Sequence, residues 1–329
     1  RRQRQMCIRD RLGRQLMREE NKQMRILSAI GIILVVAGHL GYSVFDVGGL
    51  FPYYSFHVFI FLFVSGYFYR EEAEQHLLRY IGKKCKALLL PYFIWNLVYG
   101  ILAVLLHRTG FSIGGELTLW NLFIEPFVSG HQFLYQFPAW FVPALFLIEV
   151  LNVLGRKVLS FLHLKKEWLI FAVSLLLGIA TVALAKGGHV WGYYKFPGRL
   201  LFMMPGFQLG RIYKEKLENR VNKISDGRYF FVVVGVQLLT TICCRGLAFS
   251  AVWVTGFANA AFIPYLTVVT GIAFWLRISD WISRIPSACS WFMEIGRHTY
   301  AIMMHHVFWF FVVNSICYLL SRTTVWCAE

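Results

Sequence analysis

Charged residues are scarce in this 329-residue sequence, because Asp, Glu, Lys and Arg together make up 15% of it, against about a quarter in soluble domains. Hydrophobic residues make up 57%. A soluble fold could not hide that much apolar surface behind so few charges. The composition therefore excludes a soluble enzyme, a nucleic-acid-binding module and a disordered chain.

Motifs for metal and nucleotide chemistry are also missing. The seven cysteines form no C-x-x-C pair and no Cys/His spacing of a zinc site, so neither a metal site nor a disulfide framework is indicated. The sequence contains no G-x-S-x-G, G-x-x-x-x-G-K-[ST], G-x-G-x-x-G or H-E-x-x-H motif. We therefore expect no metal cofactor, and any chemistry has to come from individual side chains.

Long apolar runs, in contrast, recur along the chain. About 20 residues are needed to cross the roughly 30 Å of a bilayer's hydrocarbon core. A soluble helical core explains one such run, but not nine in succession. We predict an all-α integral membrane protein, a polytopic bundle of nine or ten transmembrane helices. The nine predicted spans are residues 26–45, 53–69, 87–106, 139–154, 168–185, 198–213, 229–244, 258–276 and 299–320.

Two further apolar segments lie outside the nine predicted spans. Residues 246–257 (GLAFSAVWVTGF) either merge with a neighbouring span or form a tenth, partial one. Residues 117–128 (LTLWNLFIEPFV) are typical of an interfacial or re-entrant segment.

The basic residues have an uneven distribution that predicts the orientation of the chain. Lys and Arg outnumber Asp and Glu by 33 to 17, which gives a net charge of +16. Seventeen of them lie in the segments 70–86, 155–167, 214–228 and 277–298, whereas the alternate segments contain four. Basic residues collect in cytoplasmic loops, so we expect the N-terminus in the cytoplasm.

The first stretch, RRQRQMCIRDR, is unlike the rest of the sequence. It resembles translated read-through of a sequencing adapter as much as a natural N-terminus, and both interpretations stay open. We place no function on residues 1–16. Residues 17–329 are expected to form one transmembrane domain, because no loop exceeds about 32 residues, which is too short for an independent core.

Ionisable groups inside a membrane are costly, so each one is a functional hypothesis. His39 lies 13 residues into the first span, about 20 Å deep, and His57 lies about 6 Å from the outer end of the second. Consecutive helices with a short connection are neighbours, so the two imidazoles are candidates for one polar pocket, with Gly38, Gly41 and Ser65 leaving room for it. The alternative is that each histidine is satisfied by backbone or by another side chain.

Glu149, His305 and His306 are further candidates within the predicted spans. Glu149 is near mid-bilayer, where it either orients an imidazole or hydrogen-bonds across helices. His305 and His306 are adjacent on the last span and point about 100° apart, so they cannot chelate one metal together. We expect no more than one of them to face the pocket.

A dense basic cluster precedes the third span. It is explained by topology and lipid headgroups, or by a site for the phosphates of a nucleotide-bearing donor, to which Lys and Arg supply charge-assisted hydrogen bonds. The cluster consists of Arg70, Arg79, Lys83, Lys84 and Lys86.

Six segments in order carry a family resemblance: ILSAIGIILVVAGH, FIFLFVSGYFYR, RYIGKKCKALLLPYFIWNL, AWFVPALFLIEVL, LGRIYKEKLE and IGRHTYAIMMHHVF. Together they resemble the membrane acyltransferase 3 family, particularly its fucose 4-O-acetylase-like branch, over about residues 22–320. The resemblance implies a bundle of about ten transmembrane helices that transfers an acyl group, usually acetyl from cytoplasmic acetyl-CoA, to extracytoplasmic or lipid-linked glycans.

The family's first-helix motif is a basic residue, ten intervening residues and an essential histidine, which matches His39. The basic position falls on Ser28 here. Arg25 lies one turn earlier on roughly the same face and is the candidate substitute, as is Lys22. The family's arginine-rich segment matches residues 70–86 in position, without its Arg spacing.

From the residues and the resemblance we predict an acetyl-CoA-dependent O-acetyltransferase of the bacterial plasma membrane that modifies a cell-envelope or lipid-linked sugar. His39 would be the general base or the acyl carrier, with His57 in the same pocket and Glu149 fixing the tautomer. The basic cluster and Arg25 would bind coenzyme A.

Trp140 and Phe141, with the aromatic-rich segment 131–138, are candidates to stack on the acceptor sugar, although an aromatic belt explains them equally well. The rival prediction from another class is a transporter or flippase for a lipid-linked or amphiphilic substrate, with the histidines as a proton relay. An enzyme of the other large membrane acyltransferase class is a third alternative, but its usual histidine and asparagine context is missing.

Overall fold

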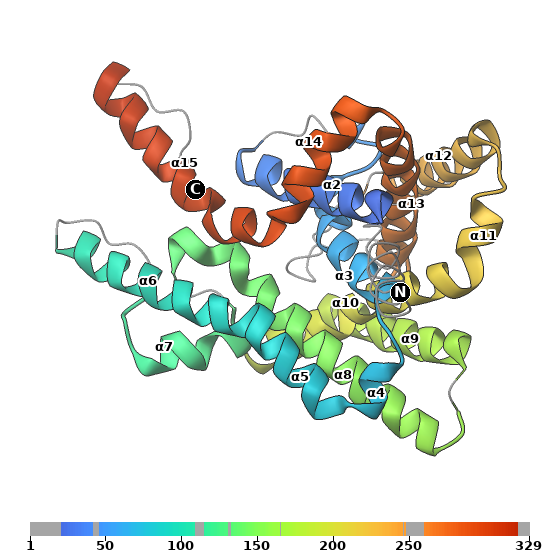
Figure 1. Cartoon of the computed structure of the whole chain (residues 1–329), viewed down its shortest axis with the longest axis horizontal. Coiled ribbons are helices and arrows are strands. Elements are labelled where there is room, and N and C mark those ends of the chain that lie inside the picture. The colour runs from blue at the N-terminus through green and yellow to red at the C-terminus, as the bar shows by residue number, and fades with distance from the viewer. Residues whose placement is uncertain are drawn as a thin grey trace, which may run out of the picture.

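The protein is an all-helical bundle in the computed structural model, which describes residues 21–41, 46–108, 115–130, 133–164, 166–245, 247 and 260–321. The structure is 83% helical, and no strand occurs in these ranges (Figure 1). The all-α prediction is therefore confirmed. The basic segment 1–16 and all but Leu247 of the segment 246–257 lie outside the described residues.

Each of the nine predicted spans overlaps one helix. These are α2 (Lys22–His39), α3 (His57–Tyr67), α6 (Leu90–His107), α8 (Phe141–Phe161), α9 (Glu167–Lys186), α10 (Lys195–Ile212), α12 (Asp226–Cys243), α13 (Ile263–Ser283) and α15 (Thr299–Ser321).

Shorter helices connect or extend these nine. They are η2 (Tyr53–Ser55), α4 (Glu72–Gln75), α5 (Leu77–Lys84), η3 (Cys85–Leu89), α7 (Leu119–Phe123), η4 (Glu125–Phe127), η5 (Leu134–Trp140), η6 (Gly192–Tyr194), η7 (Tyr213–Leu217), α11 (Glu218–Val221) and α14 (Pro286–Arg297). The segment 117–128 thus forms α7 and η4, neither of which is long enough to cross a membrane.

Six helices in the described part of the chain are long and apolar enough to cross a membrane. Three of them are α9, α12 and α15, and the other three are α2 and the continuous stretches Leu77–His107 and Leu134–Phe161. The remaining predicted spans are helices that do not meet this requirement alone. α3 has 11 residues, and α10 and α13 contain buried arginines. The fold is thus a polytopic membrane bundle.

The centre of the bundle is formed by α2, α3 and α10. α13 and α14 pack against α2 on one side, with α12 on the outside of α13, and α8 and α9 pack with α10 on the other (Figure 1). α3 and α10 approach so closely that a Cβ atom at Gly66 would overlap the Phe207 carbonyl, and one at Gly210 would overlap the Phe63 carbonyl. Small residues permit this backbone contact, as in other membrane helix pairs.

Two helices leave the bundle in different directions, since α6 and α15 diverge at the left of Figure 1. The first part of α15 nevertheless contacts α2 and η5. This contact brings the last span against the C-terminal end of the first, where His39 lies.

Candidate functional site

The structure brings together two histidines from opposite ends of the sequence. His39 ends α2, and its Nδ1 atom lies 2.9 Å from Nε2 of His306 on α15. The ring centroids are 4.9 Å apart. His306 is buried and His39 is half-buried. We call His39 and His306 the histidine pair.

Hydrogen bonding fixes the tautomers of this pair. Nδ1 of His306 lies 2.8 Å from the Ile302 carbonyl oxygen, which can only accept, so this nitrogen carries the proton. Nε2 of a neutral His306 must then accept from the Nδ1–H of His39. Nε2 of His39 is consequently the nitrogen that carries the lone pair, so His39 can act as a base or a nucleophile.

Aromatic side chains surround the histidine pair. The Phe137 ring of η5 meets the His39 imidazole edge-on, with centroids 4.9 Å apart, and Phe310 lies 5.7 Å from His306. The neighbouring His305 points to α6 instead, where its Nδ1 lies 2.8 Å from the Tyr99 hydroxyl. Only one of the two adjacent histidines therefore faces His39. The sequence predicted that no more than one of the two would face the pocket, but it did not indicate that this would be His306.

His57 is satisfied by a backbone hydrogen bond, which was the alternative given for it from the sequence. Its Nδ1 atom lies 2.8 Å from the Tyr53 carbonyl, to which it donates, and its imidazole is close enough to His39 to interact with it electrostatically. The Tyr53 ring also fills the space beside Gly38, where a Cβ would lie 2.6 Å from that ring. The expectation that Gly38 leaves room for a pocket is therefore wrong.

Glu149 belongs to a different cluster from His39. Its Oε1 atom accepts hydrogen bonds from Nζ of Lys84, at 2.7 Å, and from the Ser65 hydroxyl, and the side chain is 1% exposed. Ser65 is eight residues beyond His57 on α3, which is about 12 Å along the helix. The expectation that Glu149 orients His39 is therefore wrong, because Glu149 lies at another depth and hydrogen-bonds across helices.

The members of the basic cluster have two different environments in the structure. Lys84 turns inward to Glu149, whereas the other four members are exposed on α5, η3 and the turn before α4; they are Arg70, Arg79, Lys83 and Lys86. Arg25 lies apart, with its Nη1 atom 3.4 Å from the Gly296 carbonyl. The Ser28 hydroxyl donates to the Met24 carbonyl at 3.0 Å, within its own helix.

Trp140 and Phe141 do not offer a free aromatic face. Both are buried, 4% and 1% exposed, and the Arg199 guanidinium lies 4.4 Å from the Trp140 ring centroid. Phe141 packs against Phe61 at 5.8 Å. The stacking prediction is therefore wrong for these two residues. In the segment 131–138 it is Phe137 that reaches the histidine pair; residues 131 and 132 lie outside the described part.

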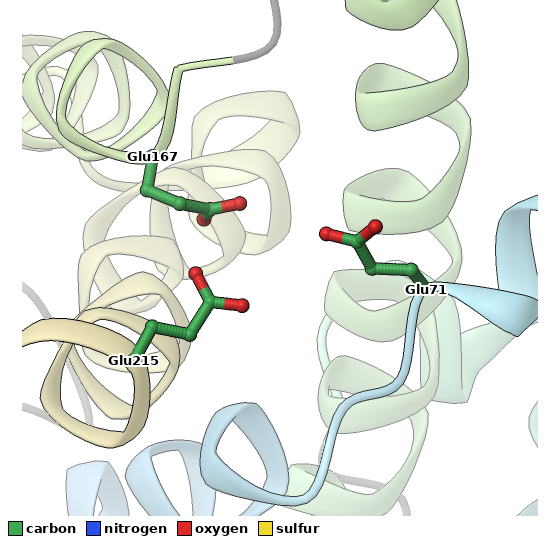
Figure 2. Close-up of side chains that lie close together, drawn as sticks. All are labelled: Glu71, Glu167 and Glu215. Carbon is green, nitrogen blue, oxygen red and sulfur yellow. The ribbon is translucent and has the colours of Figure 1, made fainter.

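A second polar cluster, not predicted from the sequence, joins the ends of four helical segments. We call it the charge network, and it consists of Glu71, Glu74, Arg156, Glu167, Arg211 and Glu215. The Glu71, Glu167 and Glu215 carboxylates face one another (Figure 2) and are spaced as metal ligands would be. The two arginines pair with all three, so we assign no metal to them.

Short ion pairs hold the charge network together. Nε of Arg156 lies 3.0 Å from Glu74, and its Nη1 lies 3.0 Å from Glu167. Nη2 of Arg211 lies 2.7 Å from Glu71. Arg156 is 1% exposed. Arg156 is one of the 17 loop charges used to predict the orientation, whereas Arg211 lies within the predicted span 198–213, and the sequence analysis assigned a structural role to neither.

These observations define a polytopic α-helical membrane protein with a buried histidine pair at the end of its first helix. The model of the membrane acyltransferase 3 family, described as an acyltransferase domain, matches residues 21–328. The chain belongs to this family and is a multi-pass membrane acyltransferase. Searches among curated proteins and among solved structures gave no match.

Proposed function

We propose that this protein is an O-acyltransferase that moves an acetyl group from cytoplasmic acetyl-CoA to a hydroxyl of a cell-envelope or lipid-linked sugar in a bacterial plasma membrane. The observation that carries this proposal is the histidine pair, in which hydrogen bonds assign the lone pair to Nε2 of His39. Acyl transfer to a hydroxyl needs such a base, because the hydroxyl has to lose its proton as it attacks.

His39 would take this proton while the sugar oxygen attacks the thioester carbonyl carbon. The new C–O bond forms, the C–S bond breaks, and the proton passes from His39 to the leaving thiolate. His306 would act as a positioning residue, because its Nε2 holds the Nδ1–H of His39 in place and supports the imidazolium that forms. In the acyl-carrier alternative, the same Nε2 attacks the thioester carbonyl carbon, the C–S bond breaks and the thiolate leaves, so that acetyl stays on His39. The sugar hydroxyl would then attack this acetyl group, the bond to Nε2 would break, and the hydroxyl proton would pass to the thiolate.

The exposed members of the basic cluster are suited to the phosphates of coenzyme A. Arg70, Arg79, Lys83 and Lys86 are exposed, and guanidinium and ammonium groups bind phosphate through charge-assisted hydrogen bonds. The excess of Lys and Arg in the loops on this side favours a cytoplasmic location. Arg25, bonded to the Gly296 carbonyl, contributes less to this proposal.

The test is acyl transfer by purified protein in proteoliposomes, with radiolabelled acetyl-CoA and a panel of envelope glycans. We expect glycan-dependent release of free coenzyme A, and a loss of about 10²- to 10⁴-fold in His39→Gln. His107→Gln is the matched control, because His107 is exposed at the end of α6. Substrate flux across the vesicle without coenzyme A release would support the transporter alternative and overturn the proposal.

A further inference from the structure

A groove of about 140 Å³ lies between α8, α9 and α10, away from the histidine pair. Most of its wall is apolar, formed by Leu151, Leu159, Ile170, Val173, Leu177 and Met204. Leu151, Val173 and Leu177 are between 41% and 47% exposed. Since α9 is a membrane-spanning helix, this exposed apolar wall faces lipid rather than water.

The groove has a polar floor with one unsatisfied donor. Asn152 lines it and is 3% exposed. Its Oδ1 atom accepts a hydrogen bond from Nε2 of Gln208 at 2.5 Å, but its Nδ2 atom has no hydrogen-bond partner among the described residues. A buried amide donor is costly to leave unpaired, and because Asn152 lines the groove, a turn of its side chain would bring this donor to an acceptor oxygen there.

The groove is long enough for part of an acyl chain. Its lining on α8 runs from Leu151 to Leu159, which is about 12 Å, and its lining on α9 runs from Ile170 to Leu177, which is about 10 Å. Half of the hydrocarbon core is about 15 Å, so the groove covers most of one leaflet. Asn152 lies four residues from Arg156, or about 6 Å along α8. This is a suitable depth for the ester carbonyl of a lipid whose headgroup lies at the Arg156 level.

We propose that this groove binds one acyl chain of a glycerophospholipid from the leaflet next to the charge network, with the ester carbonyl accepting a hydrogen bond from Nδ2 of Asn152. Lys157 and Lys166 are exposed near the same end of α8 and α9. Their positive charges suit the lipid phosphate. This lipid site is separate from the acyl-transfer site and does not depend on the proposed function.

Filling the groove provides the first test. A Cβ at Gly155, which lines the groove, would meet no atom within 4 Å, so Gly155→Leu has room to project into it without unfolding the helix. Gly235→Leu on α12 is the matched control, because it is equally unobstructed. Native mass spectrometry of protein incubated with dioleoyl phosphatidylglycerol should show one retained lipid on wild type and Gly235→Leu, and at least tenfold lower occupancy on Gly155→Leu. Equal occupancy in both leucine variants would overturn the proposal.

Lipid chemistry provides the second test. Wild type should bind the ester lipid about fivefold more tightly than the dialkyl ether analogue, which has no carbonyl, because one hydrogen bond is lost. Asn152→Leu should bind the two lipids equally. Discrimination that persists in Asn152→Leu would contradict the assigned hydrogen bond. Stoichiometric displacement of the lipid by acetyl-CoA would show that the groove belongs to the acyl donor, and would also overturn the proposal.

Discussion

The histidine pair and the charge network are two polar clusters that join helices of the same bundle in different ways. The histidine pair joins α2 to α15 through one hydrogen bond between residues that are 267 positions apart. The charge network joins α8, α9, α10 and the segment after α3 through several ion pairs. Each imidazole can gain or lose a proton, whereas a guanidinium keeps its charge. The comparison therefore separates a cluster suited to proton transfer from one suited to holding helix ends.

The two clusters also differ in what the loss of one member leaves behind. In the charge network two arginines face four glutamates, so every guanidinium is shared. Both guanidinium groups are buried, and removing one leaves carboxylates without their cation, which is costly. In the histidine pair, a lost imidazole leaves a neutral partner. Mutations in the network should therefore affect stability, and mutations in the pair should affect the reaction.

The largest expected effect on stability comes from Arg156→Met. This change leaves Glu74 and Glu167 without their closest cation, and should lower the free energy of unfolding by about 3–5 kcal/mol. Denaturation of the purified protein in detergent measures it. Arg284→Met is the control, because Arg284 pairs with Asp280 on an exposed helix face and should change stability by less than about 1 kcal/mol. Similar losses of stability in Arg156→Met and Arg284→Met would contradict the stabilising role assigned to the charge network.

The next effect is on activity, in His306→Leu. Without the Nε2 acceptor, His39 keeps its hydrogen bond to the Val35 backbone but loses the group that supports its imidazolium, and kcat should fall by about 10- to 100-fold, the range found for partners of metal-bound imidazoles. The KM for acetyl-CoA and the melting temperature should change little. His306→Gln should restore part of the rate, since its amide oxygen can accept from His39. His305→Leu, next to it on α15, is the control; a loss there as large as in His306→Leu would contradict the assignment.

The Glu149→Gln variant tests whether Glu149 stabilises the fold or takes part in acyl transfer with the histidine pair. The structure groups it with stabilising contacts, because Lys84 and Ser65 are its partners. The substitution leaves the Lys84 ammonium without its carboxylate, so we expect a loss of about 1–3 kcal/mol in stability and near-normal acyl transfer by the folded fraction. A large fall in kcat at unchanged stability would instead place Glu149 with the histidine pair.

Glu215→Gln should give the smallest effect. Burial raises the pKa of Glu215 above 4.5, and attraction to Arg211 opposes this only in part. The folded protein therefore binds this proton more tightly than the unfolded chain, so wild type carries a cost at neutral pH that disappears as the pH falls through the raised pKa toward 4.5. The variant should be more stable than wild type at pH 7 by less than about 1 kcal/mol, because the side chain is partly exposed, and the difference should vanish as the pH falls below 4.5. Melting curves over this pH range measure the difference.

Much of the fold was predictable from the sequence, because lipid imposes a simple requirement on apolar length. All nine predicted spans overlap a helix. The weaker matches are α3, α10 and α13, which lie against other helices in the bundle and need not be apolar all round. Arg199 in α10 is fully buried against Trp140, a placement that hydropathy along the chain does not reveal.

The sequence by itself determined the helical membrane class, the family and the identity of His39 as the residue to examine. These follow from local properties, namely apolar runs and the order of short motifs. The tertiary structure alone decided that His306 is the partner of His39, that Glu149 bonds Lys84, and that Arg156 holds helix ends together. Such pairings depend on how helices rotate and at what depth they meet, which is set by packing among segments far apart in the chain.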